Sequence, residues 1–329
     1  MPAMSDVSPA SSRSSTSSSY LAQVLVFCLC WSAAFPLAKL GLRDAPPLKF
    51  LCLRFLLASV LMLAWGALRA WRRGTPFFPR DPDAAGQASR WRPWVLLAVI
   101  GLCNNALYLG LCWSGMLHLS SGLSSVIIST NPVWVALAAS LLLGERLDWR
   151  RGAGLLLCMA GVCWIVWQRL GLRDDTTLGV VLVSAGALSL VAGTMLFKRW
   201  QQRLAHVDLL LNNAVQVGVS GLLLIPLALW LEAGQAIHWT PSFVWSFTLM
   251  VGLVSIAAYL LWLHLLRTRS ATEASALHFL MPPLGLLMSW LSLGEPLQGS
   301  DLLGILPVAG GLWLVTRREP RAARAAAIA

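Results

Sequence analysis

An all-α polytopic membrane protein, with ten transmembrane helices arranged as two inverted five-helix repeats, is the fold that the sequence predicts. Hydrophobic residues make up 57% of the 329 residues and charged residues only 12%, whereas soluble proteins have about 25% charged residues. Apolar runs of about 20 residues, the length that crosses a bilayer core, recur from Tyr20 to Thr316. One motif also occurs in both halves of the chain with the same neighbours.

The apolar runs are continuous, whereas the strands of a membrane barrel alternate polar and apolar residues over about ten positions. We therefore expect helices. The expected spans lie at residues 20–40, 48–68, 94–114, 119–143, 152–168, 178–198, 208–230, 241–266, 272–293 and 301–316. A disordered Ser-rich tail at residues 1–18 is expected to precede them, and a basic cytoplasmic tail at 317–329 to follow them.

The net charge of +11 is distributed unevenly between the loops. On one predicted side of the membrane lie 19 of the 25 Lys and Arg residues, with 5 on the other side and Arg54 inside a span. Because cytoplasmic loops carry the excess of Lys and Arg, we expect both termini in the cytoplasm and the protein in a bacterial-type inner membrane. The charges are also available to acidic lipid headgroups. Their distribution argues against nucleic acid as a partner.

The segments LLLGERLDW (141–149) and LSLGEPLQG (291–299) each follow an apolar run. Aligning Glu145 with Glu295 without gaps superimposes further Ser, Pro, Gly and Leu residues. The matched pairs are Ser120 and Ser270, Ser125 and Ser275, Pro132 and Pro282, Gly144 and Gly294, Leu147 and Leu297, Gly154 and Gly304, and Gly161 and Gly311. An internal duplication explains these pairs, with one repeat at residues 19–168 and the other at 169–316.

Each repeat contains five predicted spans, which is an odd number. The second copy must therefore enter the membrane from the opposite side, so the two halves are expected to be inverted. Inverted repeats with a binding site between them, near the bilayer midplane, are the architecture of secondary transporters.

Several segments are similar to the EamA type of the drug/metabolite transporter superfamily. They are CWSAAFPLAK (30–39), NPVWVALAASLLLGERLDW (131–149) and EASALHFLMPPLGLLMSWLSLGE (273–295), and the resemblance extends over nearly the whole chain. It implies ten helices, an inner-membrane permease, and export of metabolites such as amino acids through a central cavity that the two halves share.

Arg54 lies about seven residues into the second predicted span. A charge at that depth needs a partner, or must extend its side chain outward to the membrane surface. Two interpretations stay open for this residue: a structural ion pair or carbonyl contacts, and attraction of an anionic group on a substrate.

Polar and aromatic residues of spans three, one and eight are further candidates for the cavity wall. Asn105 and Tyr108 share one face of the third span, with Asn104 beside them. Adjacent amides inside a bilayer need hydrogen-bond partners, which either a water-lined cavity or a neighbouring helix supplies. The expected aromatic wall consists of Trp31, Phe35, Tyr259 and Trp262.

Pro132 and Pro282 each remove a hydrogen bond from the helix ladder and are predicted to kink spans four and nine. The carbonyl groups freed one turn upstream, around Ser129 and His278, are expected to face the cavity. Histidine titrates near neutral pH, so His278 suits proton coupling. The alternative for His278 is a packing role.

Glu145 and Glu295 follow a Gly at the end of the fourth helix of each repeat. Gly permits a left-handed turn there, and the Glu can cap the following helix. The alternative is a gating or ion-coupling role, and Lys39 and Lys198, which align weakly with each other, are assigned the same two interpretations. Glycines in spans five and ten predict close helix packing, within the chain or in a homodimer.

No P-loop, dinucleotide-binding motif or metal-ligand spacing is visible in the sequence. We therefore expect neither an enzyme nor a cofactor. The predicted function is secondary transport, by a gradient or by facilitated diffusion, that exports a small metabolite such as an amino acid through alternating access. The alternative is a flippase for a lipid-linked or amphipathic molecule. The expected partners are the substrate, the lipid bilayer and, if His278 or the glutamates couple transport, protons.

Overall fold

The computed structural model describes residues 12–78, 87–119, 124, 127–167, 176–294 and 299–316, and every regular element among them is a helix. The first half contains α1 (Ser12–Ser32), α2 (Ala34–Gly41), α3 (Pro47–Arg73), α4 (Gln87–Gly101), the π-helix η1 (Leu102–Leu107), α5 (Tyr108–Gly115), α7 (Asn131–Leu143) and α8 (Trp149–Trp167). The second half contains α9 (Thr177–Trp200), α10 (Leu209–Leu231), α11 (Pro241–Leu249), the π-helix η2 (Met250–Ala258), α12 (Tyr259–Thr268), α13 (Ala271–Ala276), the 3-10 helix η3 (Leu277–Leu280), α14 (Met281–Leu293) and α15 (Gly299–Thr316). The first residues of α1 fall in the stretch that the sequence assigns to the tail.

Seven helical segments in the described part of the chain are long and apolar enough to cross a membrane. They are Tyr20–Gly41, Pro47–Arg73, Trp91–Gly115, Thr177–Trp200, Leu209–Leu231, Pro241–Thr268 and Ala271–Ser292. Two shorter apolar helices, Ile127–Leu143 and Leu303–Thr316, fall on predicted spans four and ten, and α8 falls on span five. The chain is therefore an all-helical, multi-pass membrane protein.

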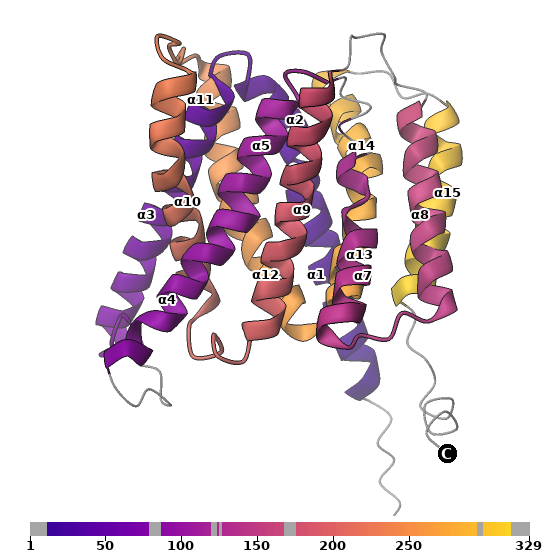
Figure 1. Cartoon of the computed structure of the whole chain (residues 1–329), viewed down its shortest axis with the longest axis horizontal. Coiled ribbons are helices and arrows are strands. Elements are labelled where there is room, and N and C mark those ends of the chain that lie inside the picture. The colour runs from indigo at the N-terminus through magenta and orange to yellow at the C-terminus, as the bar shows by residue number, and fades with distance from the viewer. Residues whose placement is uncertain are drawn as a thin grey trace, which may run out of the picture.

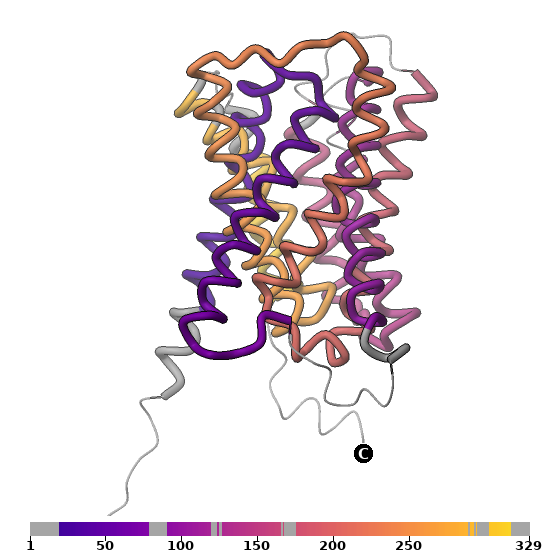
Figure 2. The backbone as a smooth tube through the Cα atoms, turned by 90° about the vertical axis from the view of Figure 1, so that its left-hand side faces the viewer, coloured from indigo at the N-terminus to yellow at the C-terminus, as the bar shows by residue number. Residues whose placement is uncertain are grey.

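Figure 1 shows the helices standing side by side, with the connections between them gathered at two ends. The turn at 144–148 and the loop at 201–208 lie at one end, which we call the lower end. The loops at 42–46 and 232–240 lie at the other, upper end. Figure 2, which views the bundle from the side, also places the loop at 201–208 and the loop at 232–240 at opposite ends.

The two most extensive helix contacts between the first and second halves of the chain are those of α8 with α15 and of α3 with α10. Glycines allow the backbones of the second pair to approach closely. A Cβ atom on Gly154 would lie only 2.7 Å from the carbonyl oxygen of Gly311, and one on Gly161 would lie 2.6 Å from that of Gly304. The glycine faces of α8 and α15 are thus used inside one chain.

Besides the segment Tyr20–Gly41, which divides into α1 and α2, three of the membrane-length segments are not regular α-helices along their whole length. The π-helix η1 separates α4 from α5, η2 separates α11 from α12, and η3 precedes α14. Pro132 lies in the first turn of α7 and Pro282 in the first turn of α14, so in both segments an α-helix begins one residue before the proline, and the predicted kinks stay predictions. π-Helical turns are rare and are frequent at functional sites, which directs attention to the side chains of η1 and η2.

We expect Gly154→Ala to lower the thermal unfolding temperature of the purified protein, because the added methyl group must push α8 away from α15. Overpacking of this kind costs about 1–3 kcal/mol. Gly152→Ala, two residues earlier on the same helix, is the control, since nothing lies within 4 Å of a Cβ atom there. Unfolding is followed by circular dichroism in detergent. Equal transition temperatures for the two variants would contradict the close approach of α8 and α15.

Candidate functional site

Five rings from three spans meet inside the bundle, and we call them the aromatic cluster: Phe27, Trp31, Tyr259, Trp262 and His278. Trp31 stacks on Tyr259 with 5.5 Å between ring centroids. The His278 ring stands edge-on to Trp262 at 4.7 Å and to Trp31 at 5.3 Å. Stacked and edge-on pairs are the favoured geometries of such rings. Phe27, Tyr259 and Trp262 are buried, whereas Trp31 and His278 are partly exposed.

Phe35, the fourth residue predicted for the aromatic wall, lies outside this cluster. Its side chain is 47% exposed and packs near Gly285 of α14. Residues four apart share one face of a regular helix, but α1 ends at Ser32 and α2 begins at Ala34. The structure therefore places Phe35 against α14 and not against Trp31. Phe27, which was not predicted, takes part in the cluster instead.

Arg54 is only 3% exposed and has mainly apolar neighbours. Its guanidinium carbon lies 4.8 Å from the centre of the Phe55 ring and 5.7 Å from that of Trp113. Its Nη1 lies 4.0 Å from the sulfur of Met250, and its Nε has no hydrogen-bond partner. The charge is near enough to Tyr259 for an electrostatic interaction. Neither the ion pair nor the carbonyl contacts expected of a structural arginine occur among the described residues.

Asn104 and Asn105 lie in η1 and are completely buried. Neither side-chain amide makes a hydrogen bond of good geometry in the described part of the protein, although the Asn105 amide lies close to the Tyr259 hydroxyl. Asn104 faces Gly193 of α9, where any side chain would collide with its amide. The hydroxyl of Tyr259 donates to the backbone carbonyl of Asn104 at 3.2 Å, which connects η1 to the aromatic cluster. The amide hydrogen bonds that would join two helices are absent from both side chains.

A second pair of adjacent amides, Asn212 and Asn213, is buried on α10. Asn213 donates to the carbonyl of Ser255 at 2.9 Å, and Gln216 donates to Asn212 at 2.6 Å. The Asn213 oxygen, the Asn212 nitrogen and the Ser255 hydroxyl have no partner. These residues were not predicted from the sequence. The available signal was the Asn-Asn dipeptide itself, which repeats the pattern of residues 104–105.

The remaining residues predicted for the cavity are spread along the inner helices. Tyr108 packs with Cys112 near the contact of α5 and α9. Ser129 and Pro132 lie at the start of α7, next to Asn131, whose buried amide also lacks a partner. Pro282 is the second residue of α14.

A pocket of about 240 Å³ lies not beside Arg54 but towards the lower end of the bundle, between α3 and the segment leading into α10. Its walls include Arg69, His206 and Asp208. Arg69 and Asp208 pair with each other at 2.9 Å.

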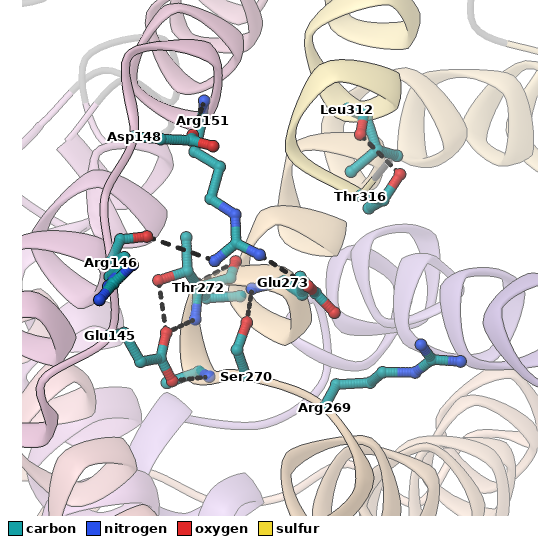
Figure 3. Close-up of polar contacts among 12 residues, drawn as sticks. Glu145, Arg146, Asp148, Arg151, Arg269, Ser270, Thr272, Glu273, Leu312 and Thr316 are labelled. Carbon is teal, nitrogen blue, oxygen red and sulfur yellow. Dashed lines mark hydrogen bonds and ion pairs between the residues drawn. The ribbon is translucent and has the colours of Figure 1, made fainter. Parts of the chain in front are cut away.

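Glu145 binds the start of α13 at the lower end, as Figure 3 shows. One carboxylate oxygen accepts from the Ala271 backbone N–H at 2.6 Å. The other accepts from the backbone N–H of Thr272 at 3.2 Å and from its hydroxyl at 2.8 Å. Gly144, with φ of +67°, supplies the left-handed turn that was predicted. The capped helix, however, is α13 of the second half and not the following helix α8.

Two further contacts tie the same helices together at the lower end. Arg151 of α8 pairs with Glu273 of α13 at 3.1 Å. The Lys198 ammonium group donates to the carbonyls of Leu266, at 2.6 Å, and Arg269. We call Glu145, Arg151, Lys198, Thr272 and Glu273 the lower-end cluster. It joins α7, α8 and α9 to the region where α12 meets α13.

At the upper end, a carboxylate of the second half binds the start of a helix in the first half. Glu232, just after α10, accepts from the backbone N–H groups of Leu48 at 2.7 Å and Lys49 at 2.8 Å, and so caps α3. Lys39 lies exposed in the last turn of α2. Glu295 lies outside the described residues. At each end, therefore, a carboxylate from one half of the chain binds the start of a helix in the other half.

The described residues contain no group of three or more His, Cys, Asp and Glu side chains placed to hold a metal ion. The centre offers stacked rings, unpartnered hydrogen-bonding groups and the charge of Arg54. Polar groups of this kind inside a membrane protein mark a substrate or ion pathway. Membrane-length helices around such a centre define a membrane transport protein.

The chain belongs to the EamA-like transporter family, whose profile matches it twice, over residues 18–167 and 177–317. The predicted resemblance is thus confirmed. An uncharacterized transporter YvbV of Bacillus subtilis is 28% identical over 300 residues, covering 91% of this chain and 92% of the relative. The family and this relative place the chain among transporters rather than enzymes.

Two relatives carry names that mention a solute. A probable terminal-alkyne amino-acid exporter of Streptantibioticus cattleyicolor is 27% identical, covering 88% of this chain and 90% of the relative. A probable amino-acid metabolite efflux pump of Escherichia coli is 25% identical, covering 88% and 92%. A crystal structure matches with a TM-score of 0.73 at 19% identity, covering 91% of this chain and 96% of the other, and shows the shared fold.

Replacing Trp31 and Phe35 separately should distinguish the aromatic cluster from its surroundings. Trp31→Ala removes a ring that stacks on Tyr259 and contacts His278, and we expect it to cost roughly 3 kcal/mol of stability. Phe35→Ala removes a half-exposed ring and should cost less than half as much. Thermal unfolding of the purified variants provides the comparison. A larger loss for Phe35→Ala than for Trp31→Ala would place the packing centre elsewhere.

Proposed function

We propose that the protein is a secondary transporter that exports a small metabolite, such as an amino acid or a related compound, by alternating access. The observation that carries this proposal is the set of buried, unpartnered polar groups between the two halves: Arg54, Asn104, Asn105, Asn212 and Asn213. Burying such groups without partners is costly, and a solute that binds them during transport supplies the partners. The names of two relatives support export and an amino-acid-like solute.

We further propose that the halves are two inverted copies related by a two-fold axis in the membrane plane. The packing of α8 on α15 supports this. Gly154 approaches Gly311 and Gly161 approaches Gly304, and in the sequence alignment Gly154 corresponds to Gly304 and Gly161 to Gly311. A two-fold axis between two copies produces this reciprocal pattern.

A contact in the middle of the α8–α15 seam supports the same two-fold axis. The Cys158 thiol donates to the carbonyl of Val308 at 3.4 Å, and these two positions correspond in the gap-free alignment. Positions that correspond and also contact each other lie on the axis itself.

In this proposal the lower end faces the cytoplasm and the lower-end cluster closes it. Arg146, Arg151, Lys198 and Arg203 lie in or beside the connections at this end, as the positive-inside rule requires. Opening toward the cytoplasm then has to break the hydrogen bonds of Glu145 to α13 and the Arg151–Glu273 pair. Both contacts are electrostatic, so they separate without disturbing packed apolar surfaces.

Metabolite profiling tests the proposed export. Cells that express the protein should accumulate a small metabolite in the medium faster than cells without it, and proteoliposomes containing the purified protein should transport that metabolite. Imposing a pH gradient across the same proteoliposomes tests proton coupling through His278, whose Nδ1 lies 3.1 Å from the Ser275 carbonyl.

Proteoliposomes with an inactive variant that still folds are the control for leakage. Identical media from expressing and non-expressing cells, together with no protein-dependent flux, would contradict export. A flux of unchanged rate with and without the pH gradient would remove the proton from the proposal while leaving transport in place.

Glu145→Gln tests the lower-end closure. Glutamine keeps the shape of the side chain but loses the charge, and hydrogen bonds to charged groups contribute about 1.5–3 kcal/mol. We expect the cytoplasmic end to open about tenfold more often. The reporter is Ser275→Cys, at a position that is 3% exposed in α13, labelled by a membrane-impermeant maleimide from the cytoplasmic side.

Asp208→Asn is the matched control for Glu145→Gln. Asp208 makes an ion pair with Arg69 at the same end, but both side chains are substantially exposed, at 52% and 39%. Asn preserves the capping of α10 about as well as Asp. Labelling that accelerates equally in both variants would assign the effect to general surface charge and not to closure by Glu145.

A further inference from the structure

The charge of Arg54 is not neutralised by the described part of the protein. The ion pairs of the described residues join Arg69 to Asp208 and Arg151 to Glu273. Glu232, a buried carboxylate, is committed to the backbone N–H groups that begin α3. Arg54 itself is 3% exposed and lies inside a membrane-length helix. A cation at that depth is costly unless it is paired.

The neighbours of Arg54 stabilise its charge without using its hydrogen-bond donors. Phe55 and Trp113 present ring faces to the guanidinium, which is favourable for a cation. A guanidinium, however, carries five N–H donors in a planar fork. The Nε–H has no acceptor, and the sulfur of Met250, 4.0 Å from Nη1, is a weak one. A planar acceptor with a negative charge is the group that this fork binds best.

Neutral hydrogen-bonding groups without partners are also buried in the interior. They are both the nitrogen and the oxygen of the Asn104 and Asn105 amides, and the indole nitrogen of Trp262. Tyr259, which stacks on Trp31, lies near enough to Arg54 to interact with its charge. No Asp or Glu side chain is buried beside these groups in the described part of the chain. The centre therefore favours an anion and offers nothing of opposite charge to an ammonium group.

We propose that Arg54 binds the carboxylate of the transported solute, and that the solute class is a monocarboxylate with an apolar or aromatic body that stacks within the aromatic cluster. An α-ammonium group is not required for recognition. This inference rests on the proposed function and specifies its substrate class. In the site, the Arg54 fork holds the carboxylate between Phe55 and Trp113, and the solute body extends past Tyr259 toward Trp31.

Binding of carboxylates and of their neutral amides to the purified full-length protein tests the proposal. The probes are acetate, butyrate, benzoate and 3-phenylpropionate, each compared with the corresponding amide, and phenylalanine compared with phenylalanine amide. The readout is the ligand-induced rise in thermal unfolding temperature. We expect the larger carboxylates to stabilise the protein at concentrations at least tenfold lower than their amides. 3-Phenylpropionate should bind at least as well as phenylalanine.

Three variants make the test specific to Arg54. Arg54→Met should abolish the stabilisation by carboxylates, and without ligand it should unfold at the same temperature as the parent protein or at a higher one, because an unpaired buried charge has been removed. Arg54→Lys, which keeps the charge and loses the fork, should weaken carboxylate binding by about tenfold. Arg69→Gln, which breaks an exposed ion pair, should leave binding unchanged.

Several outcomes would overturn the assignment. One is that amides stabilise the protein as well as carboxylates do, and another is that no probe carboxylate stabilises it at all. A third is that Arg54→Met still binds carboxylates. The last is that Arg54→Met without ligand is markedly less stable than the parent protein. The last outcome would make Arg54 a structural residue. Metabolite export is measured separately, so export that continues unchanged in Arg54→Met would reject the role of Arg54 while transport stands.

Discussion

No water is available inside a bilayer core, so every polar group there must find a partner within the protein or in a bound molecule. The backbone meets this requirement by forming helices throughout the described chain. Arg54, Asn104 and Asn105 do not meet it, since each keeps buried donors or acceptors without a partner. This contrast between satisfied backbone and unsatisfied side chains distinguishes the centre of the bundle from its surroundings, where apolar residues pack against one another.

Irregular helix geometry positions the unsatisfied groups. Asn104 and Asn105 lie in the π-helix η1, and Ser255 lies in the π-helix η2. Pro282 follows the 3-10 turn that contains His278. A regular α-helix would distribute these side chains over a fixed face at 100° per residue, whereas an inserted or tightened turn re-aims them. The two π-helices interrupt the third span of each half, so both halves contribute to the same centre.

The contacts between the halves are of two physical kinds. The seam of α8 with α15 depends on close backbone approach at Gly154 and Gly161. Because this packing acts only at short range, its stabilisation is lost as soon as the helices separate. The ends depend on carboxylates that bind helix starts, Glu145 on α13 and Glu232 on α3. Hydrogen bonds of this second kind exchange readily with water at the membrane surface. In the proposed mechanism of alternating access, the packed seam is the pivot and the exchangeable contacts are the closures.

The sequence by itself determined the helical membrane class, the family, the special places of Pro132 and Pro282 in their helices, and the grouping of Trp31, Tyr259 and Trp262. Hydropathy, proline and a repeated motif are local properties, and they are readable without coordinates. Only the tertiary structure decided that Phe35 points away from the cluster and that Glu145 caps α13 and not α8. It also decided that, among the described residues, no carboxylate pairs with Arg54. Each of these depends on which distant segment packs against a residue, and within an apolar chain many pairings satisfy the same hydropathy pattern.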